Sequence, residues 1–354
     1  MIITRAPLRI SFLGGGTDYP EYFTVEGGAV LATAIPQYAY ITANHFHSEL
    51  FDYSIRLAYR KVELVNSLND IQHAPFREAM RYCGVSKDIE LNYMADLPAF
   101  TGLGSSSSFT VALLQALHAY CGRYRSGLEL AYQAIYLERH ILGEHVGCQD
   151  QVLAAVGGIN LIEFRAEDDI VVHRLLLSPP RLAELERHLM LFFTGIRRSA
   201  SQMAGKQIQR ISENRARLRE MRYLVDRASD SLLSCRPVTE FGDILHRGWI
   251  LKRNLDAEVS CESIDGMYAR ARQAGAVGGK LLGAGGGGFL LILARPEDQP
   301  RIREQLAEYP CLPVSLGATG CHLSTGDRPG AEATGAYVAP ISSPDEPKVH
   351  AYSV

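Results

Sequence analysis

The sequence predicts an α+β protein of two domains, and three observations lead to this fold class. The 354 residues exceed the ~100–200 residues that one domain usually needs. Segments typical of strands and of helices are mixed in both halves, without the regular alternation of βαβ units. Ser178-Pro179-Pro180 interrupts the pattern near the middle of the chain. We therefore expect domains over residues 1–178 and 179–324, followed by a C-terminal tail over residues 325–354.

Short runs rich in β-branched and aromatic residues, bounded by glycine or proline, predict the strands of the first half. They cover Ile2–Thr4, Leu8–Leu13, Val30–Ala34, Tyr38–Ala43, Ile55–Ala58, Lys61–Val65, Ile89–Met94, Ile159–Phe164 and Ile170–Arg174. Apolar residues at helical spacing predict the helices of this half. These helices cover His73–Cys83, Phe109–Tyr120, Gly127–Gly143 and Asp150–Ala155.

The second half begins with a predicted strand and continues mainly as helices. Strands are expected over Leu189–Thr194, Phe289–Ala294 and Cys311–Leu316, the middle one being fully apolar and therefore buried. Helices are expected over Ser199–Leu233, Thr239–Leu255, Ser263–Gly275 and Pro300–Leu306. The composition from about Ser324 onward is typical of a poorly ordered tail.

Composition and charge exclude several classes of protein. Hydrophobic residues make up 47% and charged residues 21%, which excludes a disordered or collagen-like chain. A formal net charge of −3 offers no basic excess for nucleic acid. Seven scattered cysteines without a CxxC pair favour free thiols, and neither a signal peptide nor a long apolar run is found. We expect a cytoplasmic protein that acts on a small molecule without nucleic-acid or membrane partners, and the sequence leaves a homo-oligomer open.

A run of glycine and serine leads directly into the predicted helix Phe109–Tyr120. It reads Gly102-Leu103-Gly104-Ser105-Ser106-Ser107-Ser108. Glycine lets the backbone approach a ligand, and the free N–H groups of a helix start favour an anion. Serine hydroxyls add donors for phosphate oxygens and an oxygen ligand for Mg²⁺. On its own the run fits a phosphate-binding loop and a flexible loop with a serine N-cap equally well.

A second glycine run, Gly283-Ala284-Gly285-Gly286-Gly287-Gly288, matches the G-x-G-x-x-G pattern of dinucleotide-binding proteins. That fingerprint needs a preceding strand and a following helix. Here helical residues precede the run and the strand Phe289–Ala294 follows it. We therefore interpret the run as a tight glycine turn packed against another backbone or a ligand.

Arg9, Gly14–Gly16 and Asp18 form a third cluster, in the segment PLRISFLGGGTDYPEYF. The arginine could neutralise a phosphate or orient a carboxylate, and the aspartate could accept hydrogen bonds from sugar hydroxyls. The alternative is a hairpin turn in which Asp18 caps its own backbone.

Charged residues form two further candidate sites. Glu138 and Asp150, in ERHILGEHVGCQDQ, could serve a phosphate-bound Mg²⁺ and a reacting hydroxyl. The alternative is that Glu138 is a solvated helix charge and Asp150 a helix N-cap. Arg197 and Arg198, in TGIRRSAS, follow a predicted strand and could hold a substrate phosphate. A surface ion-pair role explains the two arginines equally well.

Taken together and in this order, three of these motifs resemble those of the GHMP kinases, the superfamily of galactokinase, homoserine, mevalonate and phosphomevalonate kinases. The motifs are APLRISFLGGGTDYPEYF (Ala6–Phe23), TGLGSSSSFTVALLQAL (Thr101–Leu117) and GGKLLGAGGGGFLLIL (Gly278–Leu293). The resemblance covers about residues 1–325. It implies an N-terminal domain like the second domain of ribosomal protein S5 and a ferredoxin-like C-terminal domain.

The resemblance also implies an ATP-dependent phosphotransferase and assigns residues to it. ATP would bind the loop from Gly102 to Ser108, with Mg²⁺ held by Ser106 and Glu138. Asp150 matches the family's catalytic aspartate, and Arg9 matches the arginine that accompanies this aspartate.

Further features resemble a narrower branch of D-glycero-α-D-manno-heptose 7-phosphate kinases and, more distantly, fucokinase-like sugar 1-kinases. These features are GGGTDYPEY, TGIRRSAS and GAGGGGF. The branch implies phosphorylation of the anomeric C1 hydroxyl to a 1,7-bisphosphate, for nucleotide-heptose and surface polysaccharide synthesis. The residues implied on the substrate side are Asp18, which matches the aspartate that holds sugar hydroxyls, with Gly15, Gly16, Arg197, Arg198, Gly285 and Gly286.

The substrate-side residues also bear on which other substrates or functions are open to the protein. Gly15 and Gly16 stand where galactokinases have Glu-His, which argues against galactose. Another sugar 1-kinase is the first alternative to the heptose phosphate. An isoprenoid-pathway kinase or related decarboxylase, and a catalytically silent nucleotide or sugar sensor, are the others.

Overall fold

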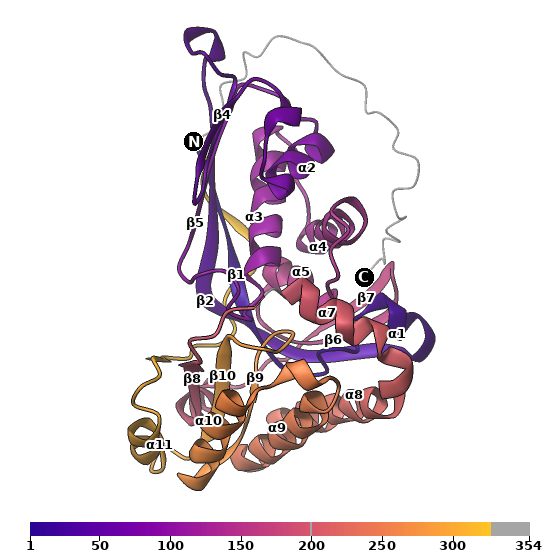
Figure 1. The fold of residues 1–354 in the computed structure, drawn as a ribbon, viewed down its shortest axis with the longest axis vertical. Helices are drawn as coiled ribbons and strands as arrows, with labels where there is room; N and C mark the ends of the chain where they lie inside the picture. Colours follow the sequence, from indigo (N-terminus) through magenta and orange to yellow (C-terminus); the bar gives the residue numbers. More distant parts are fainter. Residues whose placement is uncertain (199, 327–354) are drawn as a thin grey trace.

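The computed structural model describes residues 1–198 and 200–326 and contains two β-sheets with helices packed on them (Figure 1). One sheet has eight strands and the other has four. This mixed architecture, with one sheet in each half of the fold, confirms the predicted α+β class and two-domain layout. No helix of the described segments is long and apolar enough to cross a membrane.

The eight-stranded sheet combines the first half of the chain with one strand from its end. Its strands are β1 (Ile2–Leu13), β2 (Gly28–His45), β3 (Ile55–Ala58), β4 (Val62–Val65), β5 (Ile89–Ala95), β6 (Ile159–Ala166), β7 (Asp169–Arg174) and β12 (His322–Gly326). The main path runs β12-β1-β2-β5-β3-β4, and β6 and β7 extend it from β2. All pairs are antiparallel except β3 with β5.

Two pairs of strands predicted separately are single long strands in the structure. β1 joins Ile2–Thr4 to Leu8–Leu13, and β2 joins Val30–Ala34 to Tyr38–Ala43. The prolines that suggested breaks sit at a β-bulge, where the register of β1 against β2 shifts between Pro7 and Leu8. A bulge tolerates proline because the ladder of hydrogen bonds is already interrupted there.

Helices of the first half cover one face of this sheet, as Figure 1 shows for α2, α3, α4 and α5. The helices are α1 (Pro20–Glu26), α2 (Ala74–Cys83), α3 (Ser105–Tyr120), α4 (Gly127–Tyr136) and α5 (Gln149–Val156). A turn of π-helix, Leu137–Ile141, continues α4, and 3₁₀ turns cover Ser48–Leu50 and Leu68–Asp70. α3 is buried along most of its length, which explains why its sequence is apolar on nearly every face. The short helix α1 was not predicted.

The second half forms the four-stranded antiparallel sheet in the order β11-β8-β10-β9 and its helices. Its strands are β8 (Leu189–Phe193), β9 (Ala276–Leu281), β10 (Phe289–Ala294) and β11 (Cys311–Leu312). Its helices are α6 (Pro179–His188), α7 (Ala200–Gln209), α8 (Ile211–Leu233), α9 (Val238–Arg253), α10 (Glu262–Gln273), α11 (Gln299–Gln305) and a 3₁₀ turn, Ala257–Val259.

Two elements of this half differ from the expectations. Helix α6 was not predicted, and it begins at Ser178-Pro179-Pro180, the expected domain boundary, because proline fits the first turn of a helix. The long helix expected over Ser199–Leu233 is divided into α7 and α8 at Arg210, whose φ of −104° and ψ of 13° leave the helical range.

The two halves share a hydrophobic core. Leu8 and Phe12 of β1 belong to the same buried cluster as Leu224 of α8, Phe241 of α9 and Leu291 of β10. The rings of Phe12 and Phe241 meet edge to face, with their centroids 5.4 Å apart. This core, together with the return of β12 to β1, holds the halves in a fixed arrangement.

The predicted domain limits are 1–178, 179–324 and 325–354. In the structure, β12 follows the second half in sequence but pairs with β1 of the first half. Thr325 and Gly326, which were assigned to the tail, end β12. The rest of the predicted tail, residues 327–354, lies outside the described residues. The limits themselves stay predictions.

Candidate active site

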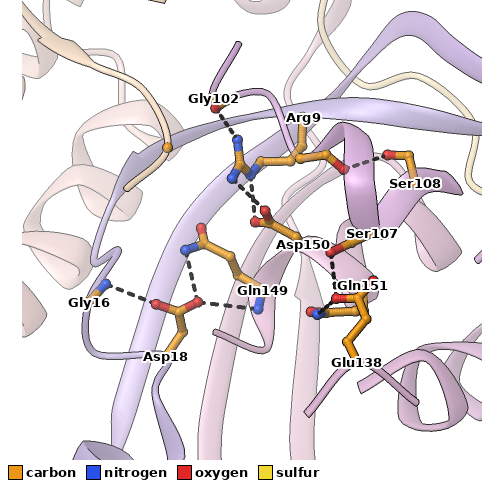
Figure 2. A network of polar contacts seen from close by, with 12 residues as sticks. Arg9, Gly16, Asp18, Gly102, Ser107, Ser108, Glu138, Gln149, Asp150 and Gln151 are labelled. Carbon is orange, nitrogen blue, oxygen red and sulfur yellow. Dashed lines mark hydrogen bonds and ion pairs between the residues drawn. The ribbon is translucent and has the colours of Figure 1, made fainter. Parts of the chain in front are cut away.

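Arg9 and Asp150, 141 residues apart in the chain, form a bidentate pair (Figure 2). Arg9 projects from β1 and donates from Nε to Oδ1 of Asp150 at 2.7 Å and from Nη2 to Oδ2 at 2.6 Å. Its Nη1 donates to the carbonyl of Gly102 at 2.6 Å. Only 5% of Arg9 is exposed, so the guanidinium is rigidly placed. Asp150 lies in the first turn of α5, whose N-cap is Cys148, so the N-cap alternative is wrong.

The Gly102–Ser108 loop lies directly against this pair. Gly104 is the N-cap of α3 and has a φ of 76°, in the left-handed region that favours glycine. A Cβ at Gly104 would lie 3.1 Å from Cγ of Arg9 and 3.3 Å from Oδ2 of Asp150. The loop is tied to β1, because Arg9 N donates to Leu103 O at 3.0 Å and Ser108 Oγ donates to Pro7 O at 2.7 Å.

This arrangement fits a polyphosphate. The N–H groups of the first turn of α3 have no acceptor within the helix, and the helix dipole adds positive charge at the same place. Glycine at two positions of the loop leaves the backbone uncovered. The loop therefore offers anion-binding donors within reach of the Arg9–Asp150 pair.

Glu138 is buried in the π-helical turn and is only 1% exposed, which rules out a solvated helix charge. Its Oε2 accepts hydrogen bonds from Ser107 Oγ at 2.9 Å and from Gln151 Nε2 at 2.5 Å. Burial raises the pKa of Glu138 to about 7. Its Oε1 is buried without a hydrogen-bond partner among the described residues.

An unpartnered carboxylate oxygen beside a phosphate-binding loop fits a divalent cation, because Mg²⁺ takes oxygen ligands and one or two protein carboxylates. The hydroxyl that donates to Glu138 Oε2 is that of Ser107. Ser106, expected to share the metal with Glu138, is exposed on the same turn of α3. The metal role of Ser106 stays a prediction.

Asp18 is buried between the triple-glycine turn and α5. Oδ1 accepts from Gly16 N at 2.9 Å, so the side chain does cap its own turn, as the alternative reading held. Oδ2 accepts from Gln149 Nε2 at 2.9 Å, which ties the turn to the residue next to Asp150. Burial raises the pKa of Asp18, and the charge of Asp150 adds to this effect. The Asp18 carboxylate thus stabilises its own turn through Gly16 and is linked through Gln149 to the residue next to Asp150.

The second glycine run packs against the first. A Cβ at Gly283 would lie 2.6 Å from the Cα of Gly102, so only glycine allows the two backbones to approach this closely. Gly285 lies against Val259, and Gly286 lies against the stem of Arg198, whose Cγ would be 3.2 Å from an added Cβ. The predicted glycine turn against another backbone is confirmed, and substrate binding by Gly285 and Gly286 stays a prediction.

Arg197 and Arg198 follow β8 and are both exposed. Within residues 1–198 and 200–326 neither has an ion-pair partner, which gives no support to the surface ion-pair alternative. Both arginines are therefore without an ion-pair partner among the described residues, and the stem of Arg198 lies near Gly286.

The sequence reasoning missed the two glutamines that flank Asp150. Gln149 holds Asp18 and Gln151 holds Glu138, so three consecutive residues of α5 contact three different parts of the site. The sequence shows the run GCQDQ, but it does not show which side chains contact the two glutamines in the folded protein. Lys252 of α9 was also missed, because a lysine near a helix end usually indicates a surface charge. It is buried, and its Nζ donates to the carbonyls of Leu281, at 3.1 Å, and Gly283.

Comparisons with known proteins relate the chain to one family of kinases. Residues 71–158 match the GHMP kinases N terminal domain and residues 231–310 match the GHMP kinases C terminal family. A D-glycero-alpha-D-manno-heptose 7-phosphate kinase of Campylobacter jejuni is 29% identical over 308 residues, covering 83% of this chain and 90% of the relative. A bifunctional fucokinase/GDP-fucose pyrophosphorylase of Arabidopsis thaliana is 28% identical, covering 86% of this chain and 31% of the relative. The chain thus spans about a third of that longer protein.

Solved structures show the same fold. A D-glycero-D-manno-heptose 1-phosphate kinase from Bacteroides thetaiotaomicron superposes with a TM-score of 0.77 at 25% identity, covering 92% of this chain and 100% of that one. A galactose complex of the Lactococcus lactis galactokinase superposes with a TM-score of 0.71 at 17% identity, covering 91% and 94%. The second likeness concerns the fold alone.

Proposed function

Because the chain is a GHMP kinase, a phosphotransferase with an alcohol group as acceptor, we propose that it phosphorylates the anomeric C1 hydroxyl of a sugar phosphate. The substrate proposed is D-glycero-α-D-manno-heptose 7-phosphate, and the product is the 1,7-bisphosphate, a precursor for nucleotide-heptose and surface polysaccharide. The observation that carries the proposal is the Arg9–Asp150 pair lying against the Gly102–Ser108 loop. Similarity to the heptose 7-phosphate kinase supports the choice of substrate.

Phosphoryl transfer requires mainly that the reactants are positioned and that negative charge is neutralised. The backbone N–H groups at the start of α3 and the hydroxyls of Ser105 to Ser108 would bind the phosphates of ATP. Glu138 and Ser106 would hold Mg²⁺, which supplies positive charge at the phosphate oxygens. Arg9 adds a fixed positive charge from β1.

Asp150 would orient the C1 hydroxyl and accept its proton as the oxygen bonds to the γ-phosphorus. The bond between that phosphorus and the β,γ-bridging oxygen breaks, and ADP leaves. Arg9 holds both carboxylate oxygens through two donors, so the carboxylate has one orientation before substrate binds. Such a positioned acid–base group typically contributes about 10²–10⁴-fold to the rate.

Two parts of the site would select the sugar. Asp18 has lone pairs beyond its bonds to Gly16 and Gln149 and would accept hydrogen bonds from ring hydroxyls. Arg197 and Arg198 would bind the phosphate that the substrate already carries, since both are exposed and without ion-pair partners among the described residues. A fucokinase-like sugar 1-kinase is the second candidate, supported by similarity to the plant fucokinase.

A coupled ADP-release assay with Mg·ATP tests the proposal. The panel contains the heptose 7-phosphate, L-fucose, galactose, mannose and mevalonate. Turnover with the heptose phosphate alone is the expected result. Turnover with an unphosphorylated sugar would keep the reaction and discard the phosphate-binding role of the two arginines, and turnover with mevalonate would contradict the proposal. ATP binding without turnover of any acceptor would favour the sensor.

A further inference from the structure

The side chain of Lys252 is buried, and among the described residues it donates hydrogen bonds to backbone carbonyls alone. It lies on the last turn of α9 and is 4% exposed. Its Nζ donates to Leu281 O at 3.1 Å and to Gly283 O. No carboxylate lies within ion-pair distance of Lys252 in the part of the chain that the structure describes. Burying an ammonium without an anion is costly, and a methionine of similar length would avoid that cost.

A continuous series of contacts leads from Lys252 to Asp150. Lys252 holds the carbonyl of Gly283, and Gly283 packs on Gly102, backbone against backbone. The carbonyl of Gly102 accepts from Arg9 Nη1 at 2.6 Å, and Arg9 holds both oxygens of Asp150. A shift of the Gly283 turn would therefore move the acceptor that orients Arg9.

Charged side chains of both signs act on Lys252. Arg9 on β1 and Lys280 on β9 repel it, whereas Asp18 and Asp150 attract it. Desolvation dominates and, together with Arg9, lowers the pKa of Lys252 to about 7. Burial lowers the pKa of Lys280 as well, and the two carboxylates already have partners in Arg9 and in Gln149.

We propose that Lys252 is a positioning residue for phosphoryl transfer, which fixes the Gly283 turn against Gly102 and takes its counter-charge from the phosphates of the bound nucleotide. The inference rests on the function proposed above. It deepens that function by adding a residue of the second half of the chain to a catalytic pair carried entirely by the first half. Negatively charged phosphates favour the ammonium form of Lys252. At a pH above the pKa that Lys252 has in the free protein, the protein therefore takes up a proton at Lys252 when the nucleotide binds.

Calorimetric titration with Mg²⁺ and a non-hydrolysable ATP analogue, in buffers of different ionisation enthalpy at about pH 8, measures this proton. At this pH Glu138 and the phosphates are already ionised, so their contribution is small. We expect the wild type to take up about 0.5 proton or more per nucleotide and Lys252→Met to take up none. Absence of proton uptake by the wild type overturns the proposal, whatever the variant does.

Kinetics separate positioning from a merely structural role. Arg181→Met is the control, because Arg181 also donates to two backbone carbonyls, Ser231 O at 2.9 Å and Leu232 O at 3.2 Å. Arg181 lies on α6, which carries neither glycine run, and it differs from Lys252 in a further ion pair with Glu184 at 3.0 Å. We expect Lys252→Met to lower kcat by about 10- to 100-fold. We expect Arg181→Met to leave kcat unchanged, whatever its effect on the melting temperature. Equal kcat values for the two variants contradict the proposal. An inactive wild type that still takes up the proton would instead contradict the proposed function.

Discussion

Replacing Asp150 with asparagine removes the charge that faces Arg9 and keeps the shape of the side chain. One oxygen remains to accept from Arg9, but the second donor meets an NH₂ group, and the proton acceptor for the sugar hydroxyl is lost. Breaking a buried ion pair costs about 3–5 kcal/mol. Asp150 is 24% exposed and Gly102 O still accepts from Arg9, so we expect a smaller loss of stability, about 1–3 kcal/mol. The loss of the acid–base group should lower kcat by about 10²–10⁴-fold.

The assay follows kcat, the KM for ATP and nucleotide affinity in the same preparation. Affinity for the nucleotide should change little, because Asp150 does not belong to the Gly102–Ser108 loop. Glu90→Gln is the matched control, since Glu90 pairs with Arg56 between β5 and β3, away from the glycine loops. That variant should keep kcat. A kcat of Asp150→Asn within about threefold of the wild type would refute the assigned role.

Three further predictions follow from the same geometry. Changing Arg197 and Arg198 together to glutamine should raise the KM for a phosphorylated sugar about 10-fold or more and leave the KM for ATP unchanged, and an unchanged KM for the sugar would contradict the phosphate role. Burial raises the pKa of Glu138 from 4.5 to about 7, so the unfolding free energy of the metal-free protein should fall as pH rises from 4.5 through 7, by up to about 3 kcal/mol. Urea titrations near the two ends of that pH range should show this decrease in the wild type and not in Glu138→Gln. An equal decrease in both proteins would mean that another group causes it. Gly104→Ala should lower kcat through contact with Arg9, whereas Gly122→Ala, with a φ of 68° and open space around it, should cost only the ~1–2 kcal/mol of backbone strain. Equal kcat values for Gly104→Ala and Gly122→Ala would contradict an effect of the Arg9 contact on catalysis.

Much of the site could be predicted from the sequence, because each motif combines a local backbone feature with a reactive side chain. The Gly102–Ser108 run predicted a loop at a helix start, and that loop is the N-terminus of α3. The resemblance then placed Arg9 beside Asp150, a pairing across 141 residues that no local pattern contains. The structure shows the two side chains in contact.

The remaining parts depend on packing between distant segments. Lys252 is buried because α9 packs beside the Gly283 turn, where Lys252 donates to the carbonyl of Gly283. Glu138 becomes buried because a π-helical turn continues α4 toward α3 and α5. Likewise β2 runs through Pro36 as one strand because the bulge opposite Pro7 absorbs the irregularity. Each outcome is decided by a neighbour far away in the sequence.

The central claim is that phosphate is transferred to the anomeric oxygen of a heptose 7-phosphate. Phosphorus and carbon NMR of the reaction with Mg·ATP tests it most directly, with Asp150→Asn as the control for transfer at the same site. The account predicts a second phosphate signal coupled to C1 and its proton, with the 7-phosphate signal unchanged, in the wild type only. Transfer to any other hydroxyl, or hydrolysis of ATP without a second phosphate on the sugar, would contradict it.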